Sequence, residues 1–335
     1  MVNRLKSILI CSLLFIFLNS GFLFAQKFEY GIKYEGIGDN REYFSRYSTP
    51  ETIFGSRLAC TVGFNTDSIH QFKTGISYFY EYGSKFLELP PHLLAYYSFN
   101  NEKLLFKMGA FPRSENLNFP AVFISSKYEY YHPTVDGLLI HYKTKNSSLG
   151  TVVDWVSRQD SDRREQFWVG FYGHQKLGRF IIDDYAYMFH NAHRMNRLPG
   201  ENIEDNMGSL VLAGINLSAE TFFDVLTLQS GMLSTAFRNR GDGSAFMFRN
   251  SSYSSLNVAY RSFGVELIMK LGSQHHLAFG DDFYNTAKNY SSLKLFADFI
   301  SSDKVKGNFA WTFHLANGDL DQQQQIKLLY YFDGH

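Results

Sequence analysis

The sequence is poor in cysteine, proline and long apolar runs, and each shortage excludes a class of structure. It contains two cysteines, Cys11 and Cys60, and seven prolines. Cys11 lies within an apolar N-terminal segment, so an exported mature chain would retain Cys60 alone and could form no internal disulfide. After Ala25 no apolar run approaches 18 residues, and we therefore expect no membrane-spanning helix in the mature chain. Without Arg4 and Lys6 the mature chain has 30 basic against 32 acidic residues, a net charge near minus two, so we expect no nucleic-acid partner.

The first 25 residues predict export. Arg4 and Lys6 precede the apolar segment ILICSLLFIFLNSGFLFA, which ends in the small residue Ala25, as a cleaved secretory signal peptide does. An uncleaved anchor is the alternative, because about 18 apolar residues span a bilayer. We divide the chain into a signal peptide, 1–25, and a single mature domain, 26–335.

Aromatic residues are abundant, and polar and apolar side chains alternate with a period of two. Aromatics make up 17% of the chain. In QFKTGISYFYEY, residues 71–82, Phe72, Ile76 and Tyr78 share one face while Lys73 and Ser77 share the other. The same alternation occurs at 103–110, 293–299 and 305–315. Segments of about 10 residues with this pattern predict transmembrane β-strands, although a β-sandwich gives the same alternation.

The connections between these segments separate the barrel from the sandwich. Short turns are expected at 64–68, 100–102, 145–147, 174–177, 218–221, 272–275 and 301–303. Longer connections are expected at 37–52, 83–91, 112–135, 159–163, 191–207, 238–252, 283–291 and 317–321. Short and long connections alternate if 253–271 is one strand, and this ordering is typical of barrels with tight periplasmic turns and larger extracellular loops. We predict an all-β fold, a transmembrane antiparallel up-and-down β-barrel of about 16 strands, with 14 to 18 as the range.

Over the mature length the chain resembles the bacterial outer-membrane porins. The resemblance rests on the signal peptide, the closed barrel and the final amphipathic strand QQQQIKLLYYFDGH, which carries an aromatic residue, Phe332, near its end. Phe332 matches the terminal aromatic of that family only approximately, because three residues follow it. The resemblance implies a protein of the bacterial cell outer membrane, with outer-membrane lipid and small hydrophilic solutes as partners. It also implies a channel for diffusion of such solutes and assembly as a homo-trimer.

The most charged segment, DWVSRQDSDRREQFWVGFYGH at 154–174, is predicted to line the lumen. Asp154 could form a cross-strand pair with Arg158 or Arg164, and the functional alternative is that the arginines contact a passing anion. The same strand assignment makes these residues channel-lining: Arg57, Lys73, Lys107, Asp154, Arg158, Arg164, Tyr172, His174, Lys294 and His314. Lumenal cations outnumber lumenal acids in this assignment, which favours anionic solutes.

The longest connection, 112–135, is too apolar to extend into water. Porins fold a comparable loop into the channel, so the resemblance implies that 112–135 narrows the lumen and that Arg113, Glu115 and Lys127 lie at the constriction. A lid over the channel mouth is the alternative.

Motifs for catalysis or metal binding are weak. His190 and His193 have no cysteine or glutamate partners close by in the sequence, and the chain contains no G-x-S-x-G motif. We therefore expect a protein that is not an enzyme and that has no metal or cofactor. Two alternatives to the channel stay open: a structural or adhesive barrel plugged by its own loops, and an outer-membrane hydrolase.

Overall fold

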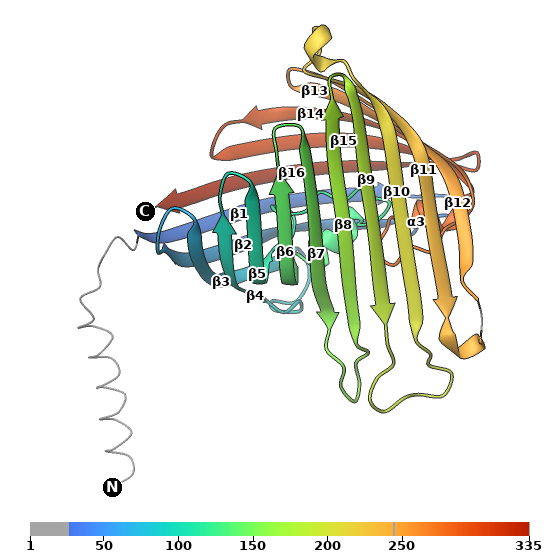
Figure 1. Cartoon of the computed structure of the whole chain (residues 1–335), viewed down its shortest axis with the longest axis horizontal. Coiled ribbons are helices and arrows are strands. Elements are labelled where there is room, and N and C mark those ends of the chain that lie inside the picture. The colour runs from blue at the N-terminus through green and yellow to red at the C-terminus, as the bar shows by residue number, and fades with distance from the viewer. Residues whose placement is uncertain (1–26, 244, 335) are drawn as a thin grey trace.

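The computed structural model describes residues 27–243 and 245–334, except for the side chain of Asp242. The expected signal peptide, 1–25, lies outside the described residues. Sixteen strands form one closed antiparallel barrel, in which each strand pairs with its neighbours in the chain and β1 pairs with β16 (Figure 1). The predicted all-β barrel of 16 strands is confirmed.

The strands differ in length by almost a factor of two. β4 and β5 have 9 residues each, whereas β1 and β16 have 16. Their bounds are β1 Lys27–Glu42, β2 Glu51–Asn65, β3 His70–Glu81, β4 His92–Asn100, β5 Leu104–Pro112, β6 Thr134–Lys143, β7 Ser147–Ser157, β8 Gln166–Leu177, β9 Phe180–Asn191, β10 Glu204–Asn216, β11 Val225–Asn239, β12 Met247–Tyr260, β13 Phe263–Gly272, β14 Asn289–Ser301, β15 Val305–Ala316 and β16 Asp319–Gly334. Short helices α2 (Ser126–Tyr131) and α3 (Asp282–Thr286) and the 3-10 turns η1 (Ser218–Glu220) and η2 (Arg240–Asp242) lie in the connections.

Period two assigns each strand residue to the lumen or to the outer wall. In β2, Phe54, Leu58 and Val62 are exposed on the outer wall, while Ile53 and Arg57 are buried toward the lumen. Exposed aliphatic and aromatic side chains cover the outer wall, because lipid solvates apolar groups and water does not. No helix among the described residues is long and apolar enough to cross a membrane.

One predicted strand and one predicted turn are wrong. Residues 253–271 form a hairpin, since Tyr260 pairs with Phe263 and Arg261 turns the chain at a φ of 53°. Neither of the two turn residues, Arg261 and Ser262, is a glycine or a proline, so the turn carries no recognisable sequence signal. The expected short turn at 272–275 belongs to a long connection, 273–288, that contains α3. The two errors cancel in the strand count.

Smaller differences concern the ends of the strands. The turn expected at 174–177 lies at 178–179, and the long connections expected at 37–52 and 238–252 shrink to 43–50 and 240–246. Polar residues at the long-loop rim, such as Asp39 and Arg41, continue the ladder of β1 instead of leaving it.

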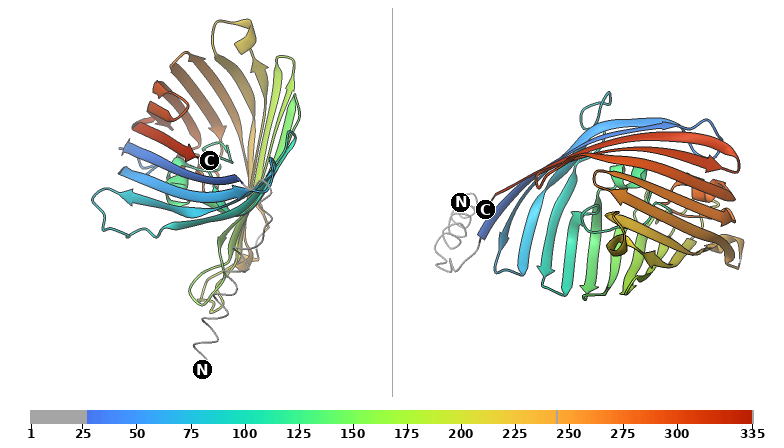
Figure 2. Two further views of the ribbon diagram at one scale, coloured as in Figure 1. Left: turned by 90° about the vertical axis from the view of Figure 1, so that its left-hand side faces the viewer. Right: turned by 90° about the horizontal axis from the view of Figure 1, so that it is seen from above.

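Three of the long connections fold into the barrel and pack against one another. We call residues 43–50, 113–133 and 273–288 the lumenal plug; Figure 2 shows α2, which belongs to it, inside the ring of strands. The Ser125 amide donates to the Phe279 carbonyl, the Asp281 amide donates to the Ala121 carbonyl, and the Tyr43 and Phe283 rings are 5.1 Å apart. The buried core of the molecule therefore lies inside the barrel, between the plug and the lumenal side chains.

Candidate functional site

The charged segment 154–174 holds the plug in place. Asp154, which is 3% exposed, accepts a hydrogen bond from Arg113 of the plug at 2.5 Å and not from Arg158 or Arg164, so the expected cross-strand pair is wrong. Arg158 and Arg164 lie in the connection between β7 and β8, outside the strands. Arg164 donates to the carbonyl oxygen of Asn191 at the end of β9 and to those of Ala192 and Asn202 in the β9–β10 connection.

The other predicted channel-lining residues face the lumen. Most of them form an ion pair, a hydrogen bond or a ring contact with another side chain. Arg57 pairs with Glu35 at 2.5 Å, and Lys73 lies 3.6 Å from Glu29. The remaining contacts join Tyr172 to His141, His174 to Asp183, Lys294 to the Phe296 ring, and His314 to Tyr290 and Gln323. Their contact with a solute stays a prediction.

The predicted constriction residues anchor the plug to the wall. Arg113 is 2% exposed and also donates to the carbonyls of His132 and Thr134. Glu115 pairs with Lys33 at 2.9 Å, and Lys127 pairs with Glu51 at 2.7 Å. Connection 113–133 lies in the lumen, and its role in narrowing a channel stays a prediction.

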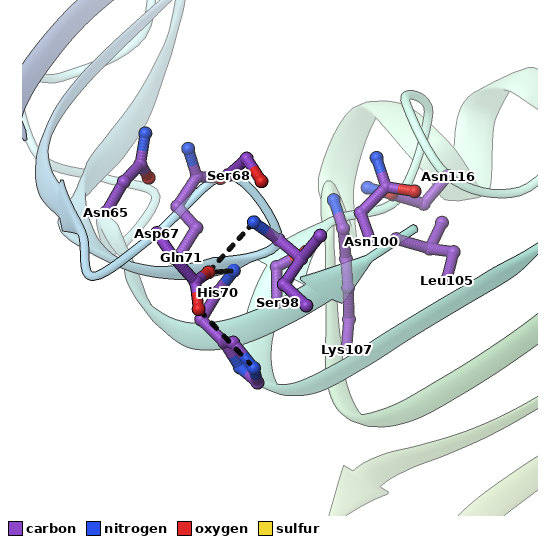
Figure 3. A pocket seen from close by; sticks show the side chains of 11 residues that line it. Asn65, Asp67, Ser68, His70, Gln71, Ser98, Asn100, Leu105, Lys107 and Asn116 are labelled. Carbon is purple, nitrogen blue, oxygen red and sulfur yellow. Dashed lines mark hydrogen bonds and ion pairs between the residues drawn. The ribbon is translucent and has the colours of Figure 1, made fainter. Parts of the chain in front are cut away.

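A lumenal pocket opens near the short-turn rim beneath the plug. It has a volume of about 340 Å³ and lies among the ends of β2–β5, with Lys107 and Asn116 on one side and Asp67 and His70 on the other (Figure 3). Asp67 accepts hydrogen bonds from the Ile69 and His70 amides and is thereby fixed in its turn. The periplasmic half of the lumen is therefore polar and hollow, whereas the extracellular half is packed.

A hydroxyl–imidazole pair inside the barrel holds part of the plug in position. Ser251 Oγ lies 2.8 Å from His275 Nε2, and Thr235 Oγ1 lies 2.9 Å from Nδ1. His275 and Ser251 are only 5% and 4% exposed, and burial lowers the pKa of His275 to about 4. Because Ser251 also bonds Ser273 of the plug, this cluster fixes connection 273–288 and has no access to a substrate.

The lipid-facing wall carries a polar cluster where β1, β2 and β16 approach the long-loop rim. We call it the outer-wall cluster; it consists of Asn40, Glu42, Thr52, Gln322 and Gln324. All five belong to the outward-facing rows of their strands, in register with one another across the β1–β16 and β1–β2 ladders. Polar side chains facing lipid are costly and point to a function.

Hydrogen bonds connect the outer-wall cluster. Asn40 Nδ2 donates to Glu42 Oε1 at 3.1 Å and to Gln324 Oε1 at 2.7 Å, and Gln322 Nε2 donates to Glu42 Oε2 at 2.5 Å. Thr52 Oγ1 donates to Asn40 Oδ1 at 2.9 Å. In the described part of the chain the amide nitrogen of Gln324 has no hydrogen-bond partner, so it can serve an incoming carbonyl oxygen.

The cluster lies at the depth of the outer-leaflet interface. Gln324 is eight residues above Phe332 on the same face of β16, which corresponds to about 20 Å along the membrane normal at the usual rise and tilt. Trp311, which pairs in register with Gln324, donates to Gln322, as an aromatic belt residue does where apolar and polar surroundings meet. Exposed Phe54, Leu315 and Leu320 surround the cluster.

The arrangement can support attack of water on an ester. A carboxylate held by two amide donors is a general base, and side-chain amides can stabilise the oxyanion that forms at the carbonyl. Sequence reasoning missed this site. Its signal was present, because Gln322 and Gln324 fall in the same alternate row as Ile326, Leu328 and Tyr330, where polar residues are not expected.

Comparisons with known proteins give a family and a fold. A model of the family described as "Lipid A 3'-O-deacylase-type" matches residues 25–332. No curated protein sequence matches the chain.

Solved structures with this fold are porins and other outer-membrane proteins. An anion-selective porin from Comamonas acidovorans superposes with a TM-score of 0.56 at 9% identity, covering 92% of this chain and 100% of the porin. OmpT of Vibrio cholerae gives 0.55 at 8% identity, covering 93% and 100%. OprB of Pseudomonas putida gives 0.53 at 10% identity, covering 92% and 94%. The predicted outer-membrane barrel of the porin type is confirmed as a fold.

The family match corrects one expectation. The chain was expected not to be an enzyme, because no catalytic motif is visible in the sequence. That expectation is wrong, since the matching model describes a family of deacylases and spans nearly the whole mature chain. The outer-wall cluster combines side chains of β1, β2 and β16 and therefore leaves no contiguous motif in the sequence.

Proposed function

Because this chain belongs to the lipid A 3'-O-deacylase-type family, we propose that it hydrolyses an acyl ester of lipid A in the outer leaflet, at the outer-wall cluster. The observation that carries the proposal is a hydrogen-bonded carboxylate–amide–hydroxyl cluster on the lipid-facing wall, at the depth where acyl esters join the headgroup. A lipid reaches this wall by lateral diffusion.

The proposed reaction is direct hydrolysis. Glu42 removes a proton from a water molecule, whose oxygen then attacks the ester carbonyl. The amide of Gln324 donates to the resulting oxyanion while Asn40 and Gln322 hold Glu42. Collapse of the tetrahedral intermediate breaks the bond to the sugar oxygen, which takes the proton back from Glu42, and a free fatty acid and an alcohol leave.

The packed plug supports an outward-facing site. The lumenal faces of β1 and β16 are occupied by contacts with α2, such as Gln325 with the Tyr130 hydroxyl and Arg41 with Ser126. An acyl chain would have to displace this buried core to react in the extracellular half of the lumen, whereas the outer wall is in contact with lipid already.

The test measures release of fatty acid from lipid A by mass spectrometry, with protein reconstituted in outer-membrane lipid. We expect Glu42→Gln to lower the rate at least about 100-fold, the size of effect expected for loss of a general base. The matched control is Gln325→Asn, on the lumenal face of the neighbouring strand β16. The proposal fails if Glu42→Gln retains the wild-type rate or if the wild-type barrel releases no fatty acid.

A channel for small hydrophilic solutes is the second candidate function. The polar pocket at the periplasmic mouth and a second lumenal cavity of about 260 Å³, lined in part by Asp183, Gln229 and Glu266, favour it. Conductance in planar bilayers tests this function, and deletion of 115–130 should raise the conductance if connection 113–133 narrows the lumen. A reversal potential in a salt gradient then tests the anion preference. Assembly as a homo-trimer stays a prediction, to be checked by the mass of the protein–detergent complex.

A further inference from the structure

A second polar feature interrupts the outer wall on the far side of the barrel, centred on β10, seven strands from β1 around the closed ring. His190, Asp205 and Arg238 are in direct register across β9, β10 and β11, and each belongs to the outward-facing row of its strand. Arg240, in the turn η2, completes the group. We call these four residues the arginine clamp.

The clamp holds two guanidinium groups on one buried carboxylate. Asp205 is 7% exposed. Arg238 donates to Asp205 Oδ2 through Nε and Nη2 at 3.1 and 2.6 Å. Arg240 donates to both carboxylate oxygens at 2.8 and 2.9 Å, and His190 Nδ1 lies 3.2 Å from Oδ1.

The charges of this group do not cancel. Two arginines face one aspartate, so the clamp carries an excess positive charge. The side chains of Arg238 and Arg240 remain 31% and 46% exposed. Each guanidinium has five N–H groups and spends two on Asp205, which leaves donors for a further anion. A carboxylate that orients two arginines in this way prepares them to bind a phosphate, which matches the planar, bidentate geometry of guanidinium.

The aromatic belt fixes the depth of the clamp. Trp155, Phe167 and His190 continue the same lateral row over β7, β8 and β9, with ring centroids 5.4 and 5.1 Å apart. Such belts lie at the level of the lipid headgroups. Asp205 is also ten residues above Ile215 at the periplasmic end of β10, which corresponds to about 25 Å along the membrane normal.

Apolar side chains flank the clamp on the lipid side. The Phe246 ring lies under Arg238, 4.3 Å from the guanidinium carbon to the ring centroid. Phe248 is 70% exposed on the outward row of β12, and Met188 is 37% exposed on β9. A ligand that presents a phosphate to the arginines and an acyl chain to these residues fits both halves of the surface.

We propose that the arginine clamp binds the phosphate of an outer-leaflet lipid, at a site separate from the outer-wall cluster. A lipid held here lies across the barrel from Glu42 and cannot be the one undergoing hydrolysis. The clamp therefore retains a second, structural lipid and anchors the tall wall of β8–β12 in the outer leaflet.

The test counts retained lipids by native mass spectrometry of the full-length mature barrel in detergent doped with phosphorylated lipid A. We expect Arg238→Gln/Arg240→Gln to weaken retention of one lipid at least tenfold. Arg240→Gln alone should weaken lipid retention less than the double variant does. Because it leaves Asp205 paired with Arg238, it also shows whether the effect persists in a barrel that keeps this ion pair. Arg163→Gln/Arg197→Gln, which removes two exposed arginines from neighbouring connections, is the matched control.

Two further arms identify the source of the phosphate. Dephosphorylated lipid A should not be retained, and inorganic phosphate at equal concentration should not displace the lipid. The proposal is overturned if both forms of lipid A bind equally, if inorganic phosphate competes equally well, or if the double variant retains as much lipid as the control. Fatty-acid release by the clamp variants should equal that of wild type, so a failure here is separate from a failure of the proposed hydrolysis.

Discussion

The two faces of β1 and β16 use the same residue types for opposite purposes. Gln323 and Gln325 point into the lumen, where both donate to Asp39 beneath α2. Gln322 and Gln324, the alternate members of the same QQQQ run, point to lipid and bond Glu42 and Asn40. The inner set fixes the plug, and the outer set builds the candidate reactive site.

This difference between the two faces shows that the same polar residue type has a structural role in the lumen and a candidate functional role on the lipid-facing wall. Inside the barrel, polar groups are expected, and their mutual hydrogen bonds satisfy them. On the outer wall, where lipid solvates apolar groups, a carboxylate is costly, and we attribute the presence of Glu42 to the proposed reaction. Variants that remove the lumenal polar residues without the outward-facing ones, or the reverse, test this difference directly.

The largest expected effect concerns the inner face of the barrel. Arg113→Ala leaves Asp154 buried without a cation, which should cost about 3–5 kcal/mol of unfolding free energy. Thermal unfolding in detergent, followed by circular dichroism, measures the loss. Arg163→Ala, which breaks an exposed pair with Asp160, is the control and should change stability by less than about 1 kcal/mol.

Glu42→Gln sharpens the comparison from the outer face. It should remove hydrolysis, about 100-fold or more, while leaving the unfolding temperature close to that of wild type, because Glu42 supports no part of the plug. Asp39→Asn on the inner face should do the reverse, lowering stability more than activity. Equal losses of activity in Glu42→Gln and Asp39→Asn would contradict the assignment of hydrolysis to the outer face alone.

The next effect is a pH dependence inside the plug. Burial raises the pKa of Asp281 from 3.8 to about 6, with Asp282 and Asp39 adding to the effect and Arg41 opposing it. The folded state holds this proton more tightly than the unfolded state, so the contribution to stability is fully present below pH 4 and is lost as pH rises through 6. Over this window Asp281→Asn should lose that part of the pH dependence, at most about 3 kcal/mol. A wild-type barrel and Asp281→Asn with parallel stability–pH curves would contradict the assignment.

The smallest effect distinguishes neighbours within the run of glutamines. Gln322→Leu removes one hydrogen bond from Glu42 and should lower hydrolysis about tenfold, the equivalent of about 1.4 kcal/mol. Gln323→Leu faces the lumen and should instead lower the unfolding temperature without this loss of rate. Fatty-acid release and thermal unfolding of the two proteins, measured side by side, give the answer.

Much of the fold could be predicted from the sequence, because period two is a local property. Alternation in 71–82 and 305–315 identified strands and the faces they present. The hairpin at Arg261 was not predicted, because an arginine gives no indication in the sequence that it will adopt the positive φ of a turn. The partner of Asp154 escaped for a different reason: Arg113 is 41 residues away, and only the folded plug brings the two together.

The candidate site was less accessible to sequence reasoning. Glu42 and Gln322 are 280 residues apart and meet only through the register of β1 against β16. The outer-face residues Asn40, Glu42 and Thr52 were interpreted as parts of a loop, since the expected connection at 37–52 included them, whereas Gln322 and Gln324 were placed in the final strand. Closure of the barrel, which no local pattern specifies, is what makes them neighbours.

Under the proposed mechanism, the pairing of the first strand with the last would also set when hydrolysis can begin. Asn40 and Glu42 lie near the start of the mature chain and Gln322 and Gln324 near its end, so their contacts require the β1–β16 pairing that closes the barrel. While the β1–β16 edge is open, the Glu42 carboxylate has no glutamine partner. Closure of the barrel would then also activate the proposed hydrolysis, so the site would not cleave lipid before the protein is assembled in the outer membrane.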